Sequence, residues 1–164
     1  TTAPADGGYL TAFVLMKPAA VTGIQLASYS YQMDKLLGSG VSAVPFGAFD
    51  FGVSNTNSWL GGGSPNGGIP VGGTGTFVFN LSGDLAGLTT SSFTDLSSTP
   101  TAAGYEGSWL AVRFRGLNFG EGSDKVTPGP PPPNEIPEPT TMALLGGALT
   151  GLALYRRRKR QRQA

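Results

Sequence analysis

Seven prolines among the thirteen residues 127–139 constrain the architecture of this 164-residue chain more than any other feature. Proline has no backbone N–H and its ring fixes φ, so such a run can enter neither a helix interior nor the middle of a sheet. We expect polyproline II, a stiff spacer of roughly 40 Å at about 3.1 Å per residue. The chain therefore divides into an ordered region, residues 1–126, and a separate C-terminal segment that begins at residue 140.

Short alternating segments, separated by glycine-rich turns, fill the region before this spacer. The clearest is residues 76–82, where Phe77, Phe79 and Leu81 fall on one face and more polar residues on the other. Weaker candidates for strands are residues 9–16, 21–30, 46–53 and 109–115. Many short strands with little helix predict an all-β domain, an antiparallel β-sandwich-like fold.

Alternation also predicts which side chains share a face of a strand. In residues 109–115, Arg113 and Arg115 lie opposite the apolar side chains, so we expect a solvated face there. In residues 9–16, one face carries Tyr9, Thr11, Phe13 and Leu15.

Two further segments depart from regular strands. Glycines interrupt residues 46–53, which predicts an irregular or bulged strand. Thr90 is a candidate N-cap for one or two helical turns over residues 90–96.

The formal net charge of +1 hides a strong asymmetry along the chain. Residues 1–155 have a net charge of −5, whereas residues 156–164 have a net charge of +6. A terminal basic cluster is typical of a nucleic-acid arm, a solvated tail or a cytoplasmic anchor beside a membrane span. The segment that precedes the cluster decides among these three.

Residues 140–155 contain no charged side chain. As a helix they would be about 24 Å long, somewhat short of the roughly 30 Å hydrocarbon core, and long arginine side chains can reach back to the head groups. Tyr155 ends the segment, where amphipathic rings favour the membrane interface. We therefore predict one transmembrane helix in the lipid bilayer, a cytoplasmic tail of residues 156–164, and no nucleic-acid partner. The predicted membrane stop consists of Arg156, Arg157, Arg158, Lys159 and Arg160.

The alternative for residues 140–155 is a buried C-terminal helix of a water-soluble domain.

Pro137, Glu138 and Pro139, followed by an apolar helix with Leu-Leu-Gly and a basic cluster, resemble the PEP-CTERM sorting signal of Gram-negative bacteria. The resemblance covers residues 136–160. It implies export, transient retention in the inner membrane, and processing by exosortase, a membrane protease for which these three residues are the recognition motif. An extended, proline-flanked tripeptide at a membrane surface suits such recognition because it cannot fold into a helix.

The ordered region is similar to the ectodomains that accompany this signal, over residues 61–69, 75–79, 112–117 and 122–126. Such ectodomains carry an export signal and further N-terminal strands. A chain that opens at Thr1 without either is therefore expected to be an N-terminally truncated fragment.

The sequence contains no cysteine and no histidine. This excludes zinc fingers, Cys-ligated iron–sulfur clusters, disulfide frameworks, and Ser-His or Cys-His catalytic pairs. The acidic residues are scattered along the chain, and we expect no catalytic, cofactor-binding or metal-binding residues. The favoured function is that of a non-enzymatic exported surface or extracellular-matrix protein of an exopolysaccharide-producing Gram-negative bacterium.

Two alternatives remain open at this point. One is a permanently membrane-anchored polysaccharide-binding module in which Tyr29, Tyr31 and Trp59 stack on sugars, although packing is their commoner role. The other is a secreted hydrolase that uses two carboxylates, and Asn118, Glu121 and Asp124 are also weak candidates for Ca²⁺ ligands. The carboxylates available to a hydrolase are Asp50, Asp84, Asp95, Glu106, Glu121 and Asp124.

Overall fold

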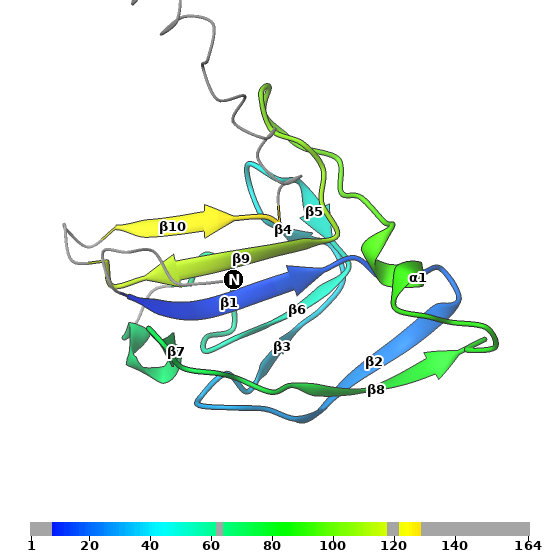
Figure 1. The fold of residues 1–164 in the computed structure, drawn as a ribbon, viewed down its shortest axis with the longest axis horizontal. Coiled ribbons are helices and arrows are strands. Elements are labelled where there is room, and N and C mark those ends of the chain that lie inside the picture. The colour runs from blue at the N-terminus through cyan, green and yellow to red at the C-terminus, as the bar shows by residue number, and fades with distance from the viewer. Residues whose placement is uncertain (1–7, 62–63, 118–121, 129–164) are drawn as a thin grey trace, which may run out of the picture. The chain divides into compact units, whose positions relative to one another are not determined.

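The computed structural model describes residues 8–61, 64–117 and 122–128. These residues form antiparallel β-sheets with almost no helix, which confirms the predicted all-β class (Figure 1). The elements are β1 (Tyr9–Leu15), β2 (Val21–Ser28), β3 (Lys35–Leu37), β4 (Val41–Ser42), β5 (Ala48–Phe49), β6 (Phe51–Ser54), the 3₁₀ turn η1 (Pro65–Gly67), β7 (Ile69–Pro70), β8 (Val78–Gly83), α1 (Ser91–Thr94), β9 (Leu110–Arg115) and β10 (Ser123–Val126).

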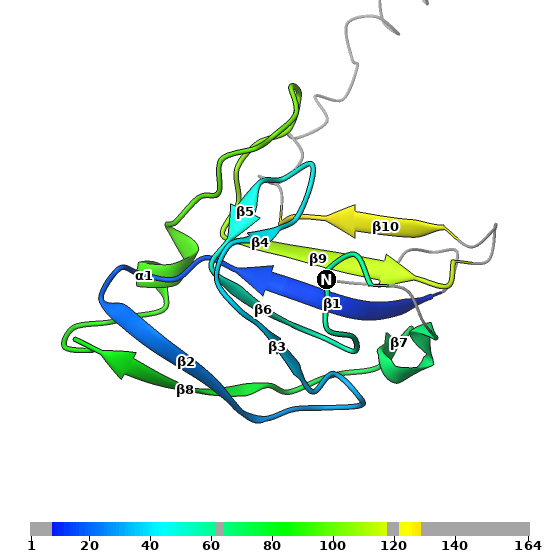
Figure 2. The same ribbon diagram turned by 180° about the vertical axis from the view of Figure 1, so that it is seen from behind.

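Strand β1 lies at the centre of the largest sheet. The strand order is β10-β9-β1-β6-β3, and β7 also pairs with β1. Strands β2 and β8 form a separate two-stranded ribbon, and β4 pairs only with β5. Both views show β2 and β8 side by side, apart from the strands of the large sheet (Figure 2).

A register shift in β1 changes which of its side chains share a face. Tyr9 pairs with Arg115 and Phe13 with Val112, and the shift lies between Leu10 and Ala12. Arg115 and Val112 are three residues apart on β9, so their side chains point to opposite faces of the sheet. Paired residues share a face, and Tyr9 and Phe13 therefore lie on opposite faces as well. The prediction that one face carries Tyr9 together with Phe13 was therefore wrong, because one extra residue in a strand reverses the alternation.

The main core covers one face of the large sheet. Val14 of β1 pairs with Ala111 of β9, so both point to this face, and both are fully buried. The chain from β3 to β6 and the segment after β6 supply the side chains that cover them. The cluster consists of Ala12, Val14, Leu37, Ala43, Phe46, Phe49, Trp59 and Ala111.

Two aromatic pairs join the β2–β8 ribbon to the face of the large sheet that lies opposite the main core. The ring centroids of Phe13 and Phe77 lie 4.8 Å apart, and those of Phe51 and Phe79 lie 5.4 Å apart, both edge to face. Such pairs contribute about 0.5–1.5 kcal/mol each beyond the area they bury. The alternation predicted for residues 76–82 is confirmed, since Phe77 and Phe79 are half-buried while Val78 is exposed.

The aromatic-rich segment 46–53 is interrupted, as expected, but the interruption lies at Asp50 and not at a glycine. The backbone N–H of Asp50 donates to the carbonyl of Leu15, and its carboxylate accepts from the backbone N–H of Lys17 at 2.9 Å. Strand β6 itself pairs with β1 in regular register through Gly52. Helical turns also form as predicted at α1, although Thr90 makes no capping bond with its side chain.

Candidate functional site

The predicted sorting residues Pro137, Glu138 and Pro139 lie outside the described residues. The same holds for the predicted membrane segment, residues 140–155, and for the basic residues that follow it. Over the described ranges 8–61, 64–117 and 122–128, no helix has both the length and the apolar character that a membrane crossing requires. The candidate sites that the structure describes therefore belong to the β-domain.

Arg113 is buried, with 8% of its surface exposed, so the prediction of a solvated face on β9 was wrong. Its guanidinium donates to the carbonyls of Trp59 at 2.6 Å and Gly61 at 3.2 Å. Burial lowers the pKa of Arg113, and the neighbouring charge of Arg115 lowers it further. The segment after β6 folds over the arginine, which strand alternation alone does not predict.

A second cation lies beside this buried arginine. Lys125 of β10 pairs with Arg113 of β9, and its ammonium donates to the carbonyl of Val44 at 3.0 Å. The pKa of Lys125 is lowered, first by burial and then by the charge of Arg113. Both cations donate to backbone carbonyls, which is consistent with a role in holding loops onto the sheet.

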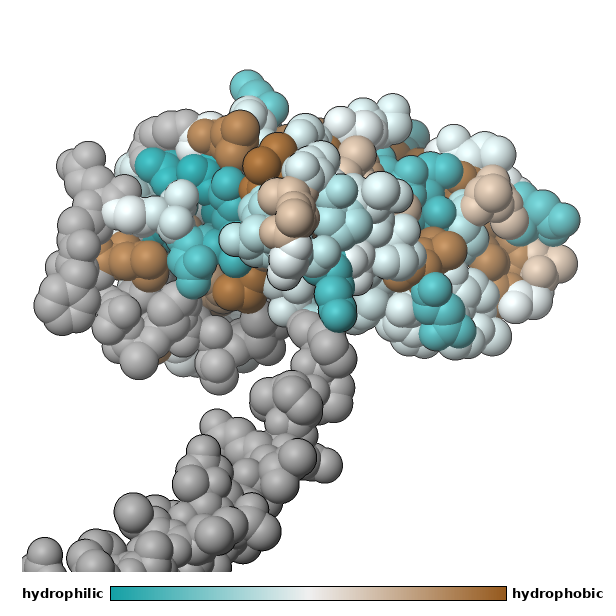
Figure 3. Space-filling model, turned by 90° about the horizontal axis from the view of Figure 1, so that it is seen from above, coloured by the Kyte–Doolittle hydropathy of each residue, from teal (hydrophilic) through white to brown (hydrophobic). Residues whose placement is uncertain are grey.

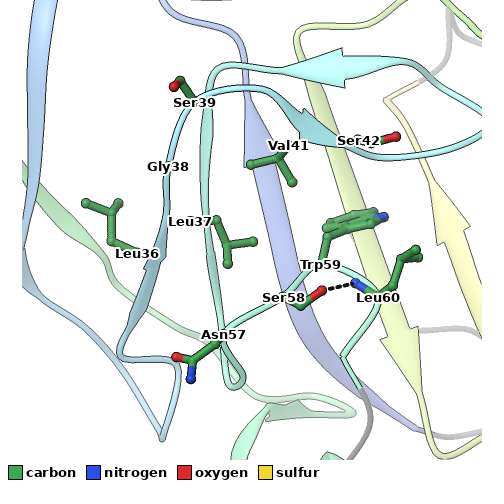
Figure 4. Close-up of a pocket in the computed structure, with 10 residues that line it drawn as sticks. All are labelled: Leu36, Leu37, Gly38, Ser39, Val41, Ser42, Asn57, Ser58, Trp59 and Leu60. Atoms are coloured by element: carbon green, nitrogen blue, oxygen red, sulfur yellow. Dashed lines mark hydrogen bonds between the residues drawn. The ribbon is translucent and has the colours of Figure 1, made fainter.

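Trp59 belongs to the core and offers no stacking face, since only 3% of its surface is exposed. Trp59 is one of the residues that line a hollow of about 400 Å³ (Figure 4). Leu36 and Leu60 form exposed rims of this hollow, and the N–H of Leu60 donates to Ser58 Oγ at 3.2 Å. The hollow contains no titratable side chain among its lining residues. Sugar stacking by Trp59 is therefore excluded in this conformation.

The acidic residues are placed without a clear catalytic arrangement in the described part of the chain. Asp50, which precedes β6, accepts a hydrogen bond from the backbone N–H of Lys17. Asp124 accepts one from the backbone N–H of its neighbour Lys125 at 2.7 Å. Among the described residues, no group of three or more acidic side chains is arranged to hold a metal ion. Asn118 and Glu121, the other suggested Ca²⁺ ligands, lie outside the described residues.

Tyr29 and Tyr31 both line one hollow at the surface. With Gln32, Asp34, Lys35 and Asn55 they line an open hollow of about 400 Å³. The two tyrosines have 50% and 44% of their surface exposed. Sequence reasoning missed Asn55, because only the pairing of β3 with β6 brings the end of β6 beside the chain before β3.

One ion pair lies in this hollow. The ammonium of Lys35 lies 2.7 Å from Asp34 Oδ2. The hydrogen bond from Lys35 is the main cause that lowers the pKa of Asp34. Desolvation opposes it, and the positive charge of Lys35 lowers the pKa further. The hollow therefore combines exposed aromatic rings, amide groups and a neutralised pair of charges.

Exposed apolar residues on the face shown in Figure 3 lie in small separate groups among hydrophilic and neutral ones. The view shows no single broad apolar surface of the kind that marks a large protein interface.

Comparison with protein families gives one match. The family model of the PEP-CTERM protein-sorting motif matches residues 135–159, and the resemblance described above is thereby confirmed. No curated protein and no solved structure matches the chain. The family match covers the C-terminal signal and does not extend into the β-domain.

Proposed function

We propose that this chain, which carries a PEP-CTERM protein-sorting motif, is a non-enzymatic exported protein of the cell surface or extracellular matrix. The motif supports export through the membrane to the cell envelope and sorting by exosortase, a membrane protein. The observation that carries the proposal is the match over residues 135–159, in which tripeptide, apolar segment and basic cluster follow in that order. The finer proposal adds an exopolysaccharide-producing Gram-negative host.

The physical basis of the sorting is the arrangement of residues 140–164. Sixteen uncharged residues favour the hydrocarbon core, and the six basic residues after them favour the cytoplasmic side of the membrane. This orientation places the proline-rich spacer and the β-domain on the outer side. Pro137, Glu138 and Pro139 then lie at the outward-facing surface of the inner membrane, where a membrane enzyme can reach an extended tripeptide.

We further propose that the β-domain is a sandwich-like ectodomain on this spacer. The edge-to-face pairs between Phe13 and Phe77 and between Phe51 and Phe79 support a second layer formed by the β2–β8 ribbon. The ectodomain is thereby the part delivered to the surface, and the tail is the part removed.

The test replaces Pro137, Glu138 and Pro139 with alanine in a host that expresses exosortase. We expect the variant to accumulate in the membrane fraction while the parent chain is released. A matched control replaces Pro131, Pro132 and Pro133, which lie in the same spacer outside the tripeptide, and it should be released like the parent. Equal release of the motif variant would contradict processing at this signal.

Intact mass of the mature protein from the same host separates processing from permanent anchoring. A mass that lacks residues 140–164 is expected if exosortase removes the tail. A mass that retains them would favour the permanently anchored polysaccharide-binding module instead.

A further inference from the structure

We propose that the hollow lined by Tyr29, Tyr31, Gln32 and Asn55 is a binding site for neutral sugar units of a polysaccharide. The hollow lies entirely within described residues and measures about 400 Å³, within the usual range for small-ligand sites. The inference goes beyond the proposed sorting function, because it concerns what the delivered domain binds.

The first step is that the segment carrying both tyrosines is fixed at several points. Ser30 Oγ accepts a hydrogen bond from the backbone N–H of Thr76 at 2.8 Å. It also donates a hydrogen bond to the carbonyl of Thr76 at 3.1 Å. The N–H of Gln32 donates to the carbonyl of Gly67 at 2.9 Å, and the side chain of Met33 is fully buried. A rigid binding surface loses little conformational entropy when a ligand binds.

The second step is the backbone of Tyr31, which has a φ of +60°. This left-handed conformation is unfavourable for a bulky residue and persists only where the surroundings impose it. In this conformation Tyr31 lies at the surface, with 44% of the residue exposed. Gly73 lies beside the tip of this side chain, since a Cβ at that position would lie 2.7 Å from Tyr31 Oη.

The third step is the chemistry of the lining. Exposed tyrosine rings offer apolar faces that suit the C–H surfaces of a sugar, and their hydroxyls remain available for hydrogen bonds. Asn55 Nδ2 donates to the carbonyl of Ser64 at 3.2 Å, which orients the amide. The amide groups of Asn55 and Gln32 can both donate and accept, as recognition of hydroxyl groups requires.

The fourth step is charge. Asp34 and Lys35 are the charged residues of the lining, and they neutralise each other across 2.7 Å. An acidic or basic ligand would have to compete with this pair for either partner. The hollow therefore suits an uncharged polyhydroxyl ligand better than an anionic one.

The experiment is calorimetric titration of the purified full chain, kept in a detergent without a sugar headgroup. The probes are three neutral hexasaccharides, cellohexaose, xylohexaose and maltohexaose, and one acidic probe, an oligogalacturonate of matched length. We expect at least one neutral hexasaccharide to bind and the acidic probe to bind more weakly. Because the protein is purified, the outcome is independent of whether exosortase processes the tail.

Two variants assign the binding to this hollow. Tyr29→Ala and Tyr31→Asn should each weaken binding roughly tenfold, the loss expected for one aromatic contact. Asparagine tolerates the left-handed conformation, so Tyr31→Asn should leave the thermal midpoint unchanged or higher and thereby separate binding from folding. The matched control is Tyr105→Ala, since Tyr105 is also 49% exposed but lies outside the hollow.

Three results would overturn the proposal. The first is the absence of binding to all three neutral hexasaccharides at their solubility limits. The second is unchanged binding in both tyrosine variants, and the third is preferential binding of the oligogalacturonate.

Discussion

At the scale of single residues, the buried guanidinium of Arg113 holds the segment after β6 against the sheet. Its two bonds to the carbonyls of Trp59 and Gly61 are charge-assisted, and such bonds contribute roughly 1.5–3 kcal/mol each. Replacing Arg113 with Met removes both bonds but also removes a costly buried charge. We therefore predict a net destabilisation of about 2 kcal/mol, measured by urea unfolding of the full chain followed by tryptophan fluorescence.

Arg115→Met is the matched control for this prediction. One guanidinium nitrogen of Arg115 is buried and has no hydrogen-bond partner within the described part of the chain. Its charge also lowers the pKa of Arg113, which means that the two cations repel each other. Because this substitution removes a repelling charge and an unpaired buried nitrogen, we expect the free energy of unfolding to stay the same or to rise. Equal losses in both variants would contradict the assigned role of Arg113.

The pKa of Asp34 provides a second prediction at this scale. Lys35 lowers this pKa below its ordinary value of 3.8, first by a hydrogen bond and then by its charge. Because the folded value is the lower one, the pair stabilises the fold above pH 3.8, and this contribution is lost as the pH falls through the folded pKa. Lys35→Gln should return the pKa of Asp34 toward 3.8, measured by NMR titration of the carboxyl carbon. An unchanged value would show that another group causes the shift.

At the scale of elements, close packing of β6 against β1 explains a glycine inside a regular strand. A Cβ at Gly52 would lie 2.3 Å from the carbonyl oxygen of Phe13 and 2.6 Å from Val14 Cγ1. Because one of these atoms belongs to the backbone, the clash cannot be relieved by a rotamer change. Gly52→Ala should therefore destabilise the domain by about 3 kcal/mol, measured as a shift of the urea midpoint. Gly38→Ala is the control, since a Cβ there meets nothing within 4 Å. Similar midpoints for the two variants would argue against this packing.

The same elements show how far the sequence alone leads. Alternation predicts the buried face of β8 because Phe77 and Phe79 follow one another at a spacing of two. It does not predict the register shift in β1, since that depends on pairing with β9, a hundred residues later in the chain. It places Arg113 on the correct side of β9. It does not predict that Arg113 is buried, because alternation contains no information about which loop covers a face. For the candidate site, packing was expected as the commoner role of Tyr29, Tyr31 and Trp59. This holds for Trp59, whereas the two tyrosines are exposed and Asn55 was missed.

At the scale of the whole molecule, the basic cluster is predicted to keep the C-terminus on the cytoplasmic side. The cluster is Arg156, Arg157, Arg158, Lys159 and Arg160. Each basic residue near an anionic leaflet contributes about 1 kcal/mol, so together they oppose transfer of the tail across the membrane by about 5 kcal/mol. Replacing all five with serine should therefore reduce retention. We expect uncleaved chain to appear outside the inner membrane. The measurement places an epitope at the C-terminus and adds protease to spheroplasts, where loss of the epitope shows that the tail has crossed the membrane.

A variant in which the four arginines of this cluster become lysine is the control that separates charge from side-chain shape. Lysine carries the same charge and also reaches the head groups, so this variant should be retained and processed like the parent. If the serine variant is retained equally well, the sixteen uncharged residues alone must hold the chain in the membrane. If instead the lysine variant is lost from the membrane, the cluster is read by shape, which would assign it to recognition by a protein and not to the lipid field.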